Sequence, residues 1–188
     1  VSFRLVDSEV AAEVELERRA RNDELTGLLN RKELFDRLER VTSERRVGGN
    51  CLAVLFCDID DFKAVNDRSG HASGDALLRT VAERIRACVR RADLVGRFGG
   101  DEIVVVLDSV HDVDESVEVA DKIRQAVALP IELPHGPQRV TMSIGCTLFS
   151  HDEDADAAIA RADRAMYLAK EAGRDRVVSL PRPEDGVA

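Results

Sequence analysis

Residues 51–61 have the sequence C-L-A-V-L-F-C-D-I-D-D, an unbroken apolar run that ends in three closely spaced carboxylates. A run without alternation is expected of a central strand that is covered on both faces. Two shorter apolar runs, at 94–98 and 102–107, are joined by Gly99-Gly100. Short apolar runs joined by a glycine pair are typical of a hairpin. These three runs therefore predict the centre of a β-sheet.

The segments around these runs carry apolar residues at helical spacing. Asn30 and Glu33 form a pattern like a capping box, which predicts the start of a helix. We expect an α/β (α+β) fold with a central mixed, mostly antiparallel sheet of about five strands flanked by helices. Further helices are expected at 60–66, 75–89, 114–128 and 155–172, further strands at 140–149 and 176–180, a turn at 70–74 and a loop at 130–137.

The two ends of the chain differ in composition from the middle. Residues 1–22 are charged and, from Ser8 to Arg21, read as a helical stalk whose apolar spacing is too irregular for sustained heptads. A chain that opens without Met in such a helix fits the carboxy-terminal piece of a longer protein, and processing would leave the same appearance. We expect the domain to span 23–180, followed by a frayed tail, rich in Pro and acidic residues, at 181–188.

Composition excludes several classes of protein. The 188 residues, 44% of them hydrophobic, suffice for one well-buried domain with an appendage. With 36 acidic residues against 27 Lys and Arg, the net charge is −9, which disfavours a nucleic-acid polymer as partner. No apolar run approaches the length of a membrane span, and the amino end lacks the order of a signal peptide, so we expect no membrane contact. The four cysteines show neither disulfide nor metal spacing, which favours the cytoplasm.

Two groups of carboxylates mark a candidate site. Asp58, Asp60 and Asp61 follow the buried strand, and Asp101 and Glu102 follow the glycine pair of the hairpin. If the two strands are neighbours, Asp58 and Asp101 converge and can hold one or two divalent cations on a triphosphate. Each group also has an ordinary structural reading, since an aspartate-rich turn can cap a helix and a hairpin tip can simply be solvated.

Several spaced motifs, in order, resemble the GGDEF domain family. They are D-E-L-T-G-L-L-N-R at 23–31, F-C-D-I-D-D-F-K-A-V-N-D-R-S-G-H-A-S-G-D at 56–75, R-F-G-G-D-E-I at 97–103, S-I-G at 143–145 and A-D-R-A-M-Y-L-A-K-E-A-G-R-D at 162–175. These diguanylate cyclases condense two GTP into cyclic di-GMP, on a palm-like fold similar to that of class III adenylyl cyclases and polymerases. The resemblance covers almost the whole chain.

The resemblance implies a metal site and a catalytic centre. Asp58, Asp101 and the Ile59 carbonyl would bind divalent ions, Mg²⁺ or Mn²⁺, two per active site, with Glu102 nearby. Asp101 would accept or relay the proton of the attacking 3′-OH. The catalytic set implied in this way is Asp58, Asp101, Glu102 and Lys170.

The resemblance also implies how GTP and the product are bound. Asn66 and Asp75 would recognise guanine, whose edge offers groups that adenine lacks. The phosphates would be held by Phe62 and Lys63 and by Lys170 and Arg174, and the R-x-x-D motif of Arg90 and Asp93 would bind inhibitory product. Taken singly, Lys170 and Arg174 are also ordinary residues for the last turn of a helix, where the helix dipole favours cations. The R-x-x-D spacing of Arg90 and Asp93 is likewise common for a surface pair on a helix end.

One position departs from the family pattern, and four others add little to it. The signature ends in Ile103 where the family usually has Phe. We expect Ile103 to point into the core, with altered packing behind the hairpin and with catalysis retained at a slower rate. His71, Asp60, Asp61 and Asp67 are expected to stabilise turns or cap helices rather than bind ligands.

The resemblance implies an enzyme that works as a homodimer, because one site holds one GTP and the product has two-fold symmetry. An upstream sensor or receiver domain would set the geometry of the dimer through the stalk. Two alternatives are a catalytically inactive domain that acts as a receptor for cyclic di-GMP or GTP, and a pure dimerisation module. The retained Asp58, Asp101, Lys170 and Arg174 count against both alternatives.

Overall fold

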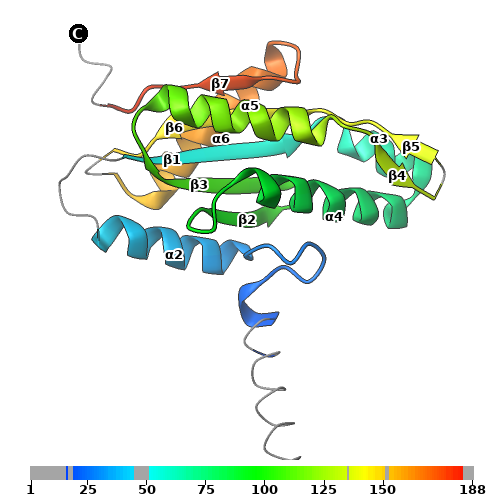
Figure 1. Ribbon diagram of the computed structural model, residues 1–188, viewed down its shortest axis with the longest axis horizontal. Coiled ribbons are helices and arrows are strands. Elements are labelled where there is room, and N and C mark those ends of the chain that lie inside the picture. The colour runs from blue at the N-terminus through cyan, green and yellow to red at the C-terminus, as the bar shows by residue number, and fades with distance from the viewer. Residues whose placement is uncertain (1–15, 17–18, 45–50, 135, 151–152, 184–188) are drawn as a thin grey trace, which may run out of the picture.

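The computed structural model describes residues 16, 19–44, 51–134, 136–150 and 153–183 (Figure 1). Five strands form one sheet in the order β2-β3-β1-β6-β7, and every neighbouring pair is antiparallel except β6 and β7. The strands are β1 (Cys51–Ile59), β2 (Leu94–Gly99), β3 (Glu102–Val110), β6 (Met142–Leu148) and β7 (Val177–Ser179). The predicted mixed, mostly antiparallel sheet of about five strands is confirmed.

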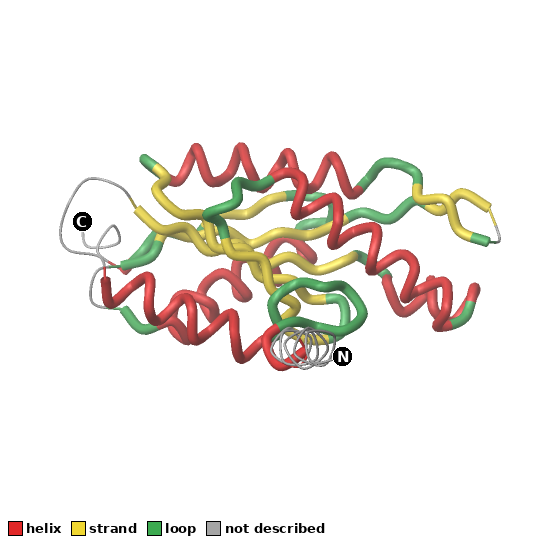
Figure 2. The backbone as a smooth tube through the Cα atoms, turned by 60° about the horizontal axis from the view of Figure 1, so that its bottom comes forward, coloured by secondary structure: helices red, strands yellow, loops and turns green. Residues whose placement is uncertain are grey.

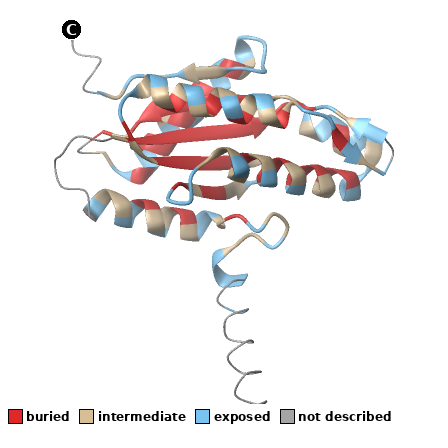
Figure 3. Cartoon of the chain, in the orientation of Figure 1, coloured by how far each residue is buried: buried red, intermediate tan, exposed pale blue. Residues whose placement is uncertain are grey.

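Helices cover both faces of this sheet (Figure 2). They are α2 (Arg31–Glu44), α3 (Phe62–Ser69), α4 (His71–Cys88), α5 (Val113–Val127) and α6 (Ala155–Glu171). Alternate residues of β1 enter two separate cores: Leu55 packs with residues of α4 and α5, and Val54 packs with residues of α2 and α6. The unbroken apolar run of β1 is therefore explained by burial on both faces (Figure 3).

Ile103 lies in the core on the α4–α5 side and is fully buried. The expectation that this side chain points inward is confirmed. Whether it slows catalysis remains a prediction.

The α2 cap is half of the predicted capping box. The Asn30 Oδ1 atom accepts a hydrogen bond from the Glu33 backbone N–H at 2.9 Å. The Glu33 carboxylate accepts from Arg37 Nε at 2.7 Å instead of reaching back to Asn30. In a full capping box the Glu33 side chain would accept from the Asn30 backbone N–H. Here Asn30 caps the helix alone, and Glu33 instead forms an i,i+4 ion pair with Arg37.

The expected turn at 70–74 is wrong, because α4 already begins at His71. Gly70, at φ 80°, makes the change of direction between α3 and α4 on its own. Gly74 lies inside the first turns of α4, and a Cβ there would meet Asn66 Oδ1 at 1.9 Å. This glycine therefore serves the close packing of two helices. His71 is an exposed first residue of a helix rather than a turn residue.

The loop expected at 130–137 contains a small hairpin, β4 (Ile131–Leu133) paired with β5 (Gly136–Gln138). Most of the expected stalk and the end of the expected tail lie outside the described residues. Leu16 and 19–21 are helical. Among the helices that the structure describes, none has the length and apolar character needed to cross a bilayer.

Candidate active site

The two groups of carboxylates come together at one end of the sheet. In the pairing of β1 with β3, Asp58 lies opposite Glu102. Asp101 belongs to the turn that joins β2 to β3, and its charge acts on the pKa of Asp58. The predicted convergence of Asp58 and Asp101 is therefore present in the fold.

Asp58 is more deeply buried than Asp101 and Glu102, with 6% of the residue exposed. Its Oδ1 atom lies 2.7 Å from Lys170 Nζ, which reaches the site from the last turn of α6. Burial raises the pKa of Asp58 to about 6; the hydrogen bond from Lys170 opposes this shift, and the charges of Asp101 and Glu102 add to it. A buried carboxylate is thus held beside one cation and two like charges.

Asp101 and Glu102 also have pKa values that burial raises. Burial raises the pKa of Asp101, with Lys170 and Arg97 opposing the shift. Burial also raises the pKa of Glu102, and the charges of Asp163 and Asp101 raise it further. Concentrated negative charge of this kind is relieved by a bound cation.

The donor set fits a hard divalent cation in its chemistry. Carboxylate oxygens are the ligands that Mg²⁺ prefers, and Asp58 already binds a cationic group, the Lys170 ammonium. Among the described residues, no three His, Cys, Asp or Glu side chains are gathered as a ready-made metal cage. Magnesium is usually bound by one or two carboxylates together with substrate phosphates, so Asp58 and Asp101 suffice as the protein's share.

Arg97 fixes the hairpin tip. Its Nε and Nη2 atoms donate to the Gly100 carbonyl at 2.9 and 2.7 Å, and its Nη1 atom donates to Asp23 at 3.2 Å. The Asp23 carboxylate in turn accepts from the Thr26 backbone N–H and hydroxyl. The first motif of the chain therefore supports the turn that carries Asp101, a role that sequence reasoning missed.

The residues expected to bind guanine lie on α3 and α4. Asn66 is in α3, and its side chain lies against Gly74, the neighbour of Asp75 in α4. Asn66 and Asp75 are both half-buried. The two helices thus bring these side chains to one region, although 66 and 75 are nine positions apart in the chain.

The residues expected to hold phosphate come from two elements. Phe62 is half-buried and Lys63 is exposed in the first turn of α3. Arg174 follows α6 with φ 63°, and its Nε atom lies 3.7 Å from Asp61 Oδ1. Both partners of that ion pair are largely exposed, so it contributes little to stability.

Arg90 and Asp93 do not form the surface pair that their spacing suggests. Asp93 is buried, and its two carboxylate oxygens accept from the backbone N–H groups of Arg90 at 2.6 Å and Asp108 at 3.0 Å. The Arg90 guanidinium is exposed and lies 3.4 Å from Glu115. Asp93 is therefore an anchor between the α4–β2 loop and β3, and Arg90 is the member of the motif that faces solvent.

We expect Asp93→Ala to lower the free energy of unfolding by about 2–3 kcal/mol, because two buried N–H donors would lose a charged acceptor. Arg90→Ala removes only an exposed ion pair and should cost less than about 1 kcal/mol. Urea unfolding of both variants measures the difference. Equal stabilities would contradict the anchoring role of Asp93.

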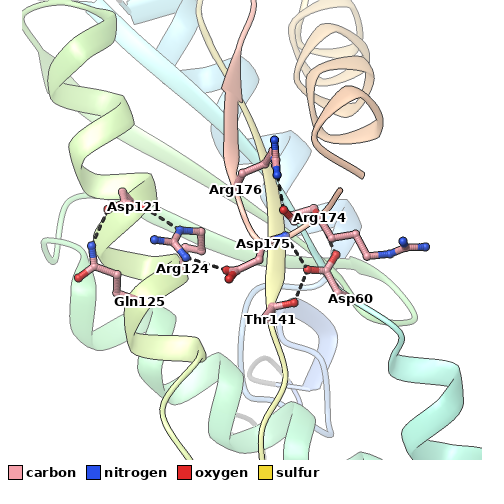
Figure 4. A network of polar contacts seen from close by, with 9 residues as sticks. Asp60, Asp121, Arg124, Gln125, Thr141, Arg174, Asp175 and Arg176 are labelled. Carbon is pink, nitrogen blue, oxygen red and sulfur yellow. Dashed lines mark hydrogen bonds and ion pairs between the residues drawn. The ribbon is translucent and has the colours of Figure 1, made fainter. Parts of the chain in front are cut away.

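Asp60 is the residue that sequence reasoning placed least well. It is buried, and its carboxylate accepts from Thr141 Oγ1 at 2.6 Å, Ser143 Oγ at 2.7 Å and the Asp175 backbone N–H at 3.1 Å (Figure 4). The expectation that Asp60 stabilises a turn or caps a helix is wrong. It ties the end of β1 to the start of β6 and to the segment after α6. Its partners are more than eighty positions away, so no local pattern could have identified them.

In the metal-free protein, the contribution of Asp58 to stability should fall as pH rises from about 4 to about 7. The folded state raises the pKa of Asp58 from 3.8 to about 6, so the folded protein holds this proton more tightly than the unfolded chain. The stabilisation from Asp58 is complete at low pH and is lost as pH rises through that window, by up to about 3 kcal/mol.

The measurement is urea unfolding with a chelator present, at about pH 4 and about pH 7, for the wild type and Asp58→Asn. The variant lacks the titrating group, so its stability should depend less on pH. Identical pH dependence in the two proteins would show that Asp58 is not the group responsible.

Known proteins resemble this chain along most of its length. The family model described as "Diguanylate cyclase, GGDEF domain" matches residues 20–176. Diguanylate cyclase DgcP of Pseudomonas aeruginosa is 40% identical over 160 residues, which cover 85% of this chain and 24% of that protein. The chain thus spans about a quarter of the length of this relative.

Solved structures show the same fold. The GGDEF domain of TpbB from Pseudomonas aeruginosa is 39% identical, with a TM-score of 0.77 over 84% of this chain and 93% of that chain. The coiled coil and GGDEF domain of DgcB from Caulobacter crescentus, solved with c-di-GMP, is 29% identical, with a TM-score of 0.83 over 95% of this chain and 98% of that chain. The chain belongs to the GGDEF domain family of diguanylate cyclases.

Proposed function

We propose that this domain is catalytically active and condenses two GTP molecules into cyclic di-GMP, with release of two pyrophosphates. The observation that carries the proposal is the meeting of Asp58 and Asp101 beside Lys170 at the end of the sheet. Diguanylate cyclases generally use a divalent metal ion. The three side chains provide oxygen ligands and a cation in one place.

Divalent ions, Mg²⁺ or Mn²⁺ and two per site in our proposal, would acidify the ribose 3′-OH and neutralise charge on the leaving pyrophosphate. Asp58, Asp101 and the Ile59 carbonyl would bind them, with Glu102 as a neighbouring carboxylate. Asp101 accepts the proton of the 3′-OH as that oxygen attacks the α-phosphate. Its raised pKa suits a group that must take up a proton.

The remaining residues bind and orient the nucleotide. Asn66 and Asp75 recognise the guanine edge from α3 and α4. Lys170 and Arg174 hold the β- and γ-phosphates as fixed cations, with Phe62 and Lys63 beside them. In the free protein the Lys170 ammonium contacts Asp58, and its three N–H donors allow it to contact a phosphate as well.

Catalysis requires two copies of the domain. One site holds one GTP, and two equal attacks close a two-fold symmetric ring, so two loaded sites must face each other. Residues 1–22 would connect the domain to an upstream sensor or receiver domain that sets this arrangement. The DgcB structure, which combines a coiled coil with a GGDEF domain, supports such a connection.

The second candidate is a receptor that binds cyclic di-GMP without turnover. The exposed Arg90 guanidinium is available to stack on guanine, and the DgcB structure was solved with c-di-GMP. The same contact would serve product inhibition in an active enzyme. Asp93 contributes to either role mainly by fixing the backbone of Arg90.

The test is pyrophosphate release from GTP with Mg²⁺ or Mn²⁺, measured across a range of protein concentrations for the wild type and Asp101→Ala. We expect the wild-type rate per protomer to rise with concentration and the variant to be inactive. Nucleotide binding without turnover, even when dimerisation is forced by a fused zipper, would favour the receptor. Full activity of Asp101→Ala would overturn the role of Asp101.

A further inference from the structure

We propose that Asp60 and Arg124 are positioning residues that fix Arg174 for the terminal phosphates of the nucleotide. The inference rests on the proposed function, which assigns those phosphates to Arg174. Neither Asp60 nor Arg124 touches the substrate in this proposal. They act through Asp175, which both of them contact (Figure 4).

The segment after α6 is conformationally strained. Gly173, Arg174 and Asp175 have φ angles of 110°, 63° and 45°, so two non-glycine residues in succession are left-handed. Such residues persist only where the surrounding structure holds them. The segment therefore needs external contacts to keep Arg174 in place.

The backbone of Arg174 is held on both sides. Its N–H donates to the Ala169 carbonyl at 3.0 Å, and its carbonyl accepts from Arg176 Nε at 2.9 Å. The next N–H, that of Asp175, donates to Asp60 Oδ2. Asp60 accepts hydrogen bonds from Ser143 in β6 and from Thr141 just before this strand, so its contact with Asp175 fixes the strained segment to the sheet.

Arg124 holds the same segment from α5. Its Nη1 atom lies 2.7 Å from Asp175 Oδ1, and its Nε atom lies 2.7 Å from Asp121 Oδ1. Gln125 donates to the second oxygen of Asp121. The guanidinium is thus oriented by its own helix before it reaches Asp175, which favours a directed contact over a loose surface ion pair.

The side chain of Arg174 is not fixed to the same degree. About half of it is exposed, and its 3.7 Å contact with Asp61 is with a side chain that is 72% exposed. Its direction toward a ligand is therefore set mainly by the backbone of 173–175. Loosening that backbone should weaken phosphate binding without changing the guanine contacts of α3 and α4.

The test compares the binding of GTP with that of GMP, which lacks the β- and γ-phosphates. Arg124→Gln should weaken GTP binding by about threefold to fivefold and leave GMP binding unchanged. Lys122→Gln is the matched control: it removes the same charge from the same helix, but Lys122 donates to the Cys88 carbonyl. Equal weakening of GTP and GMP, or no weakening of GTP, would overturn the proposal.

A double-mutant cycle sharpens the result. Asp175→Asn retains the N–H that donates to Asp60 and a side chain that tolerates φ near 45°, but it loses the charge. If the ion pair acts as a unit, Asp175→Asn should have the same effect as Arg124→Gln, and the double variant no more. Additive effects would contradict action through this pair.

Asp60→Ala should weaken GTP binding by at least about tenfold, because the strained segment loses its anchor. Asp60→Asn keeps an acceptor for Asp175 and should restore most of the binding. In GTP turnover, Arg124→Gln should raise KM and leave kcat nearly unchanged. An inactive wild type would refute the proposed function, whereas the binding comparison would still decide the role of Asp60 and Arg124.

Discussion

Asp58→Asn should lower the rate of pyrophosphate release from GTP by at least about a thousandfold, because the substitution removes a charged ligand for the divalent ions. The same change should stabilise the metal-free protein at neutral pH. Burial raises the pKa of Asp58 to about 6, so its charged form is disfavoured in the folded state. Asparagine has the same shape and retains an oxygen that can accept from Lys170, which now lies 2.7 Å from Asp58.

This combination of effects separates a functional residue from a structural one. A carboxylate kept for folding would lose stability when neutralised, whereas one kept for catalysis at the expense of stability gains it. The expected gain is up to about 3 kcal/mol by urea unfolding with a chelator at about pH 7.

Asp67→Asn is the control for Asp58→Asn, since Asp67 is an exposed carboxylate on the neighbouring helix α3. It should leave both the rate and the stability unchanged. Retention of activity by Asp58→Asn would exclude Asp58 as a metal ligand. A loss of stability together with a loss of activity would show that the residue serves the fold.

The sheet could be predicted from the sequence because its signals are local. The unbroken run of β1 and the Gly-Gly hairpin specify strands without reference to distant residues. Once β1 and β3 pair, Asp58 must lie near the hairpin tip, so the convergence of Asp58 with Asp101 followed from the same patterns.

The start of α4 and the roles of Asp60 and Asp93 could not be predicted in this way. Gly70 and Gly74 read alike as turn residues, but only Gly70 has a positive φ, and Gly74 is required by the side chain of Asn66. From the sequence, Asp60 is interpreted as a turn or capping residue and Asp93 as a ligand-binding residue. In the structure both accept hydrogen bonds from segments that only the complete fold brings near. Buried carboxylates are defined by their donors, and the donors are distant in sequence.

The packing of α6 against β6 determines whether Lys170 can reach Asp58. Gly145 lies in β6 beneath this helix, and a Cβ at that position would lie 1.9 Å from the Ala162 carbonyl oxygen and 2.2 Å from the Met166 backbone nitrogen. Both atoms belong to the backbone of α6, so no side chain can rotate away. The glycine of the S-I-G motif thus permits the close approach of helix and sheet.

Gly145→Ala should therefore lower the free energy of unfolding by at least about 3 kcal/mol, a large part of the stability of a domain of this size. Gly96→Ala is the matched comparison, because the three atoms nearest to a Cβ there all belong to the side chain of Leu34, at 2.9 to 3.1 Å. It should cost about 1 kcal/mol, since part of that side chain can shift, and Leu34→Val should recover some of the loss. Urea unfolding of the two alanine variants makes the comparison. Equal costs would show that α6 can move away from the sheet, and the fixed distance between Lys170 and Asp58 would then need another cause.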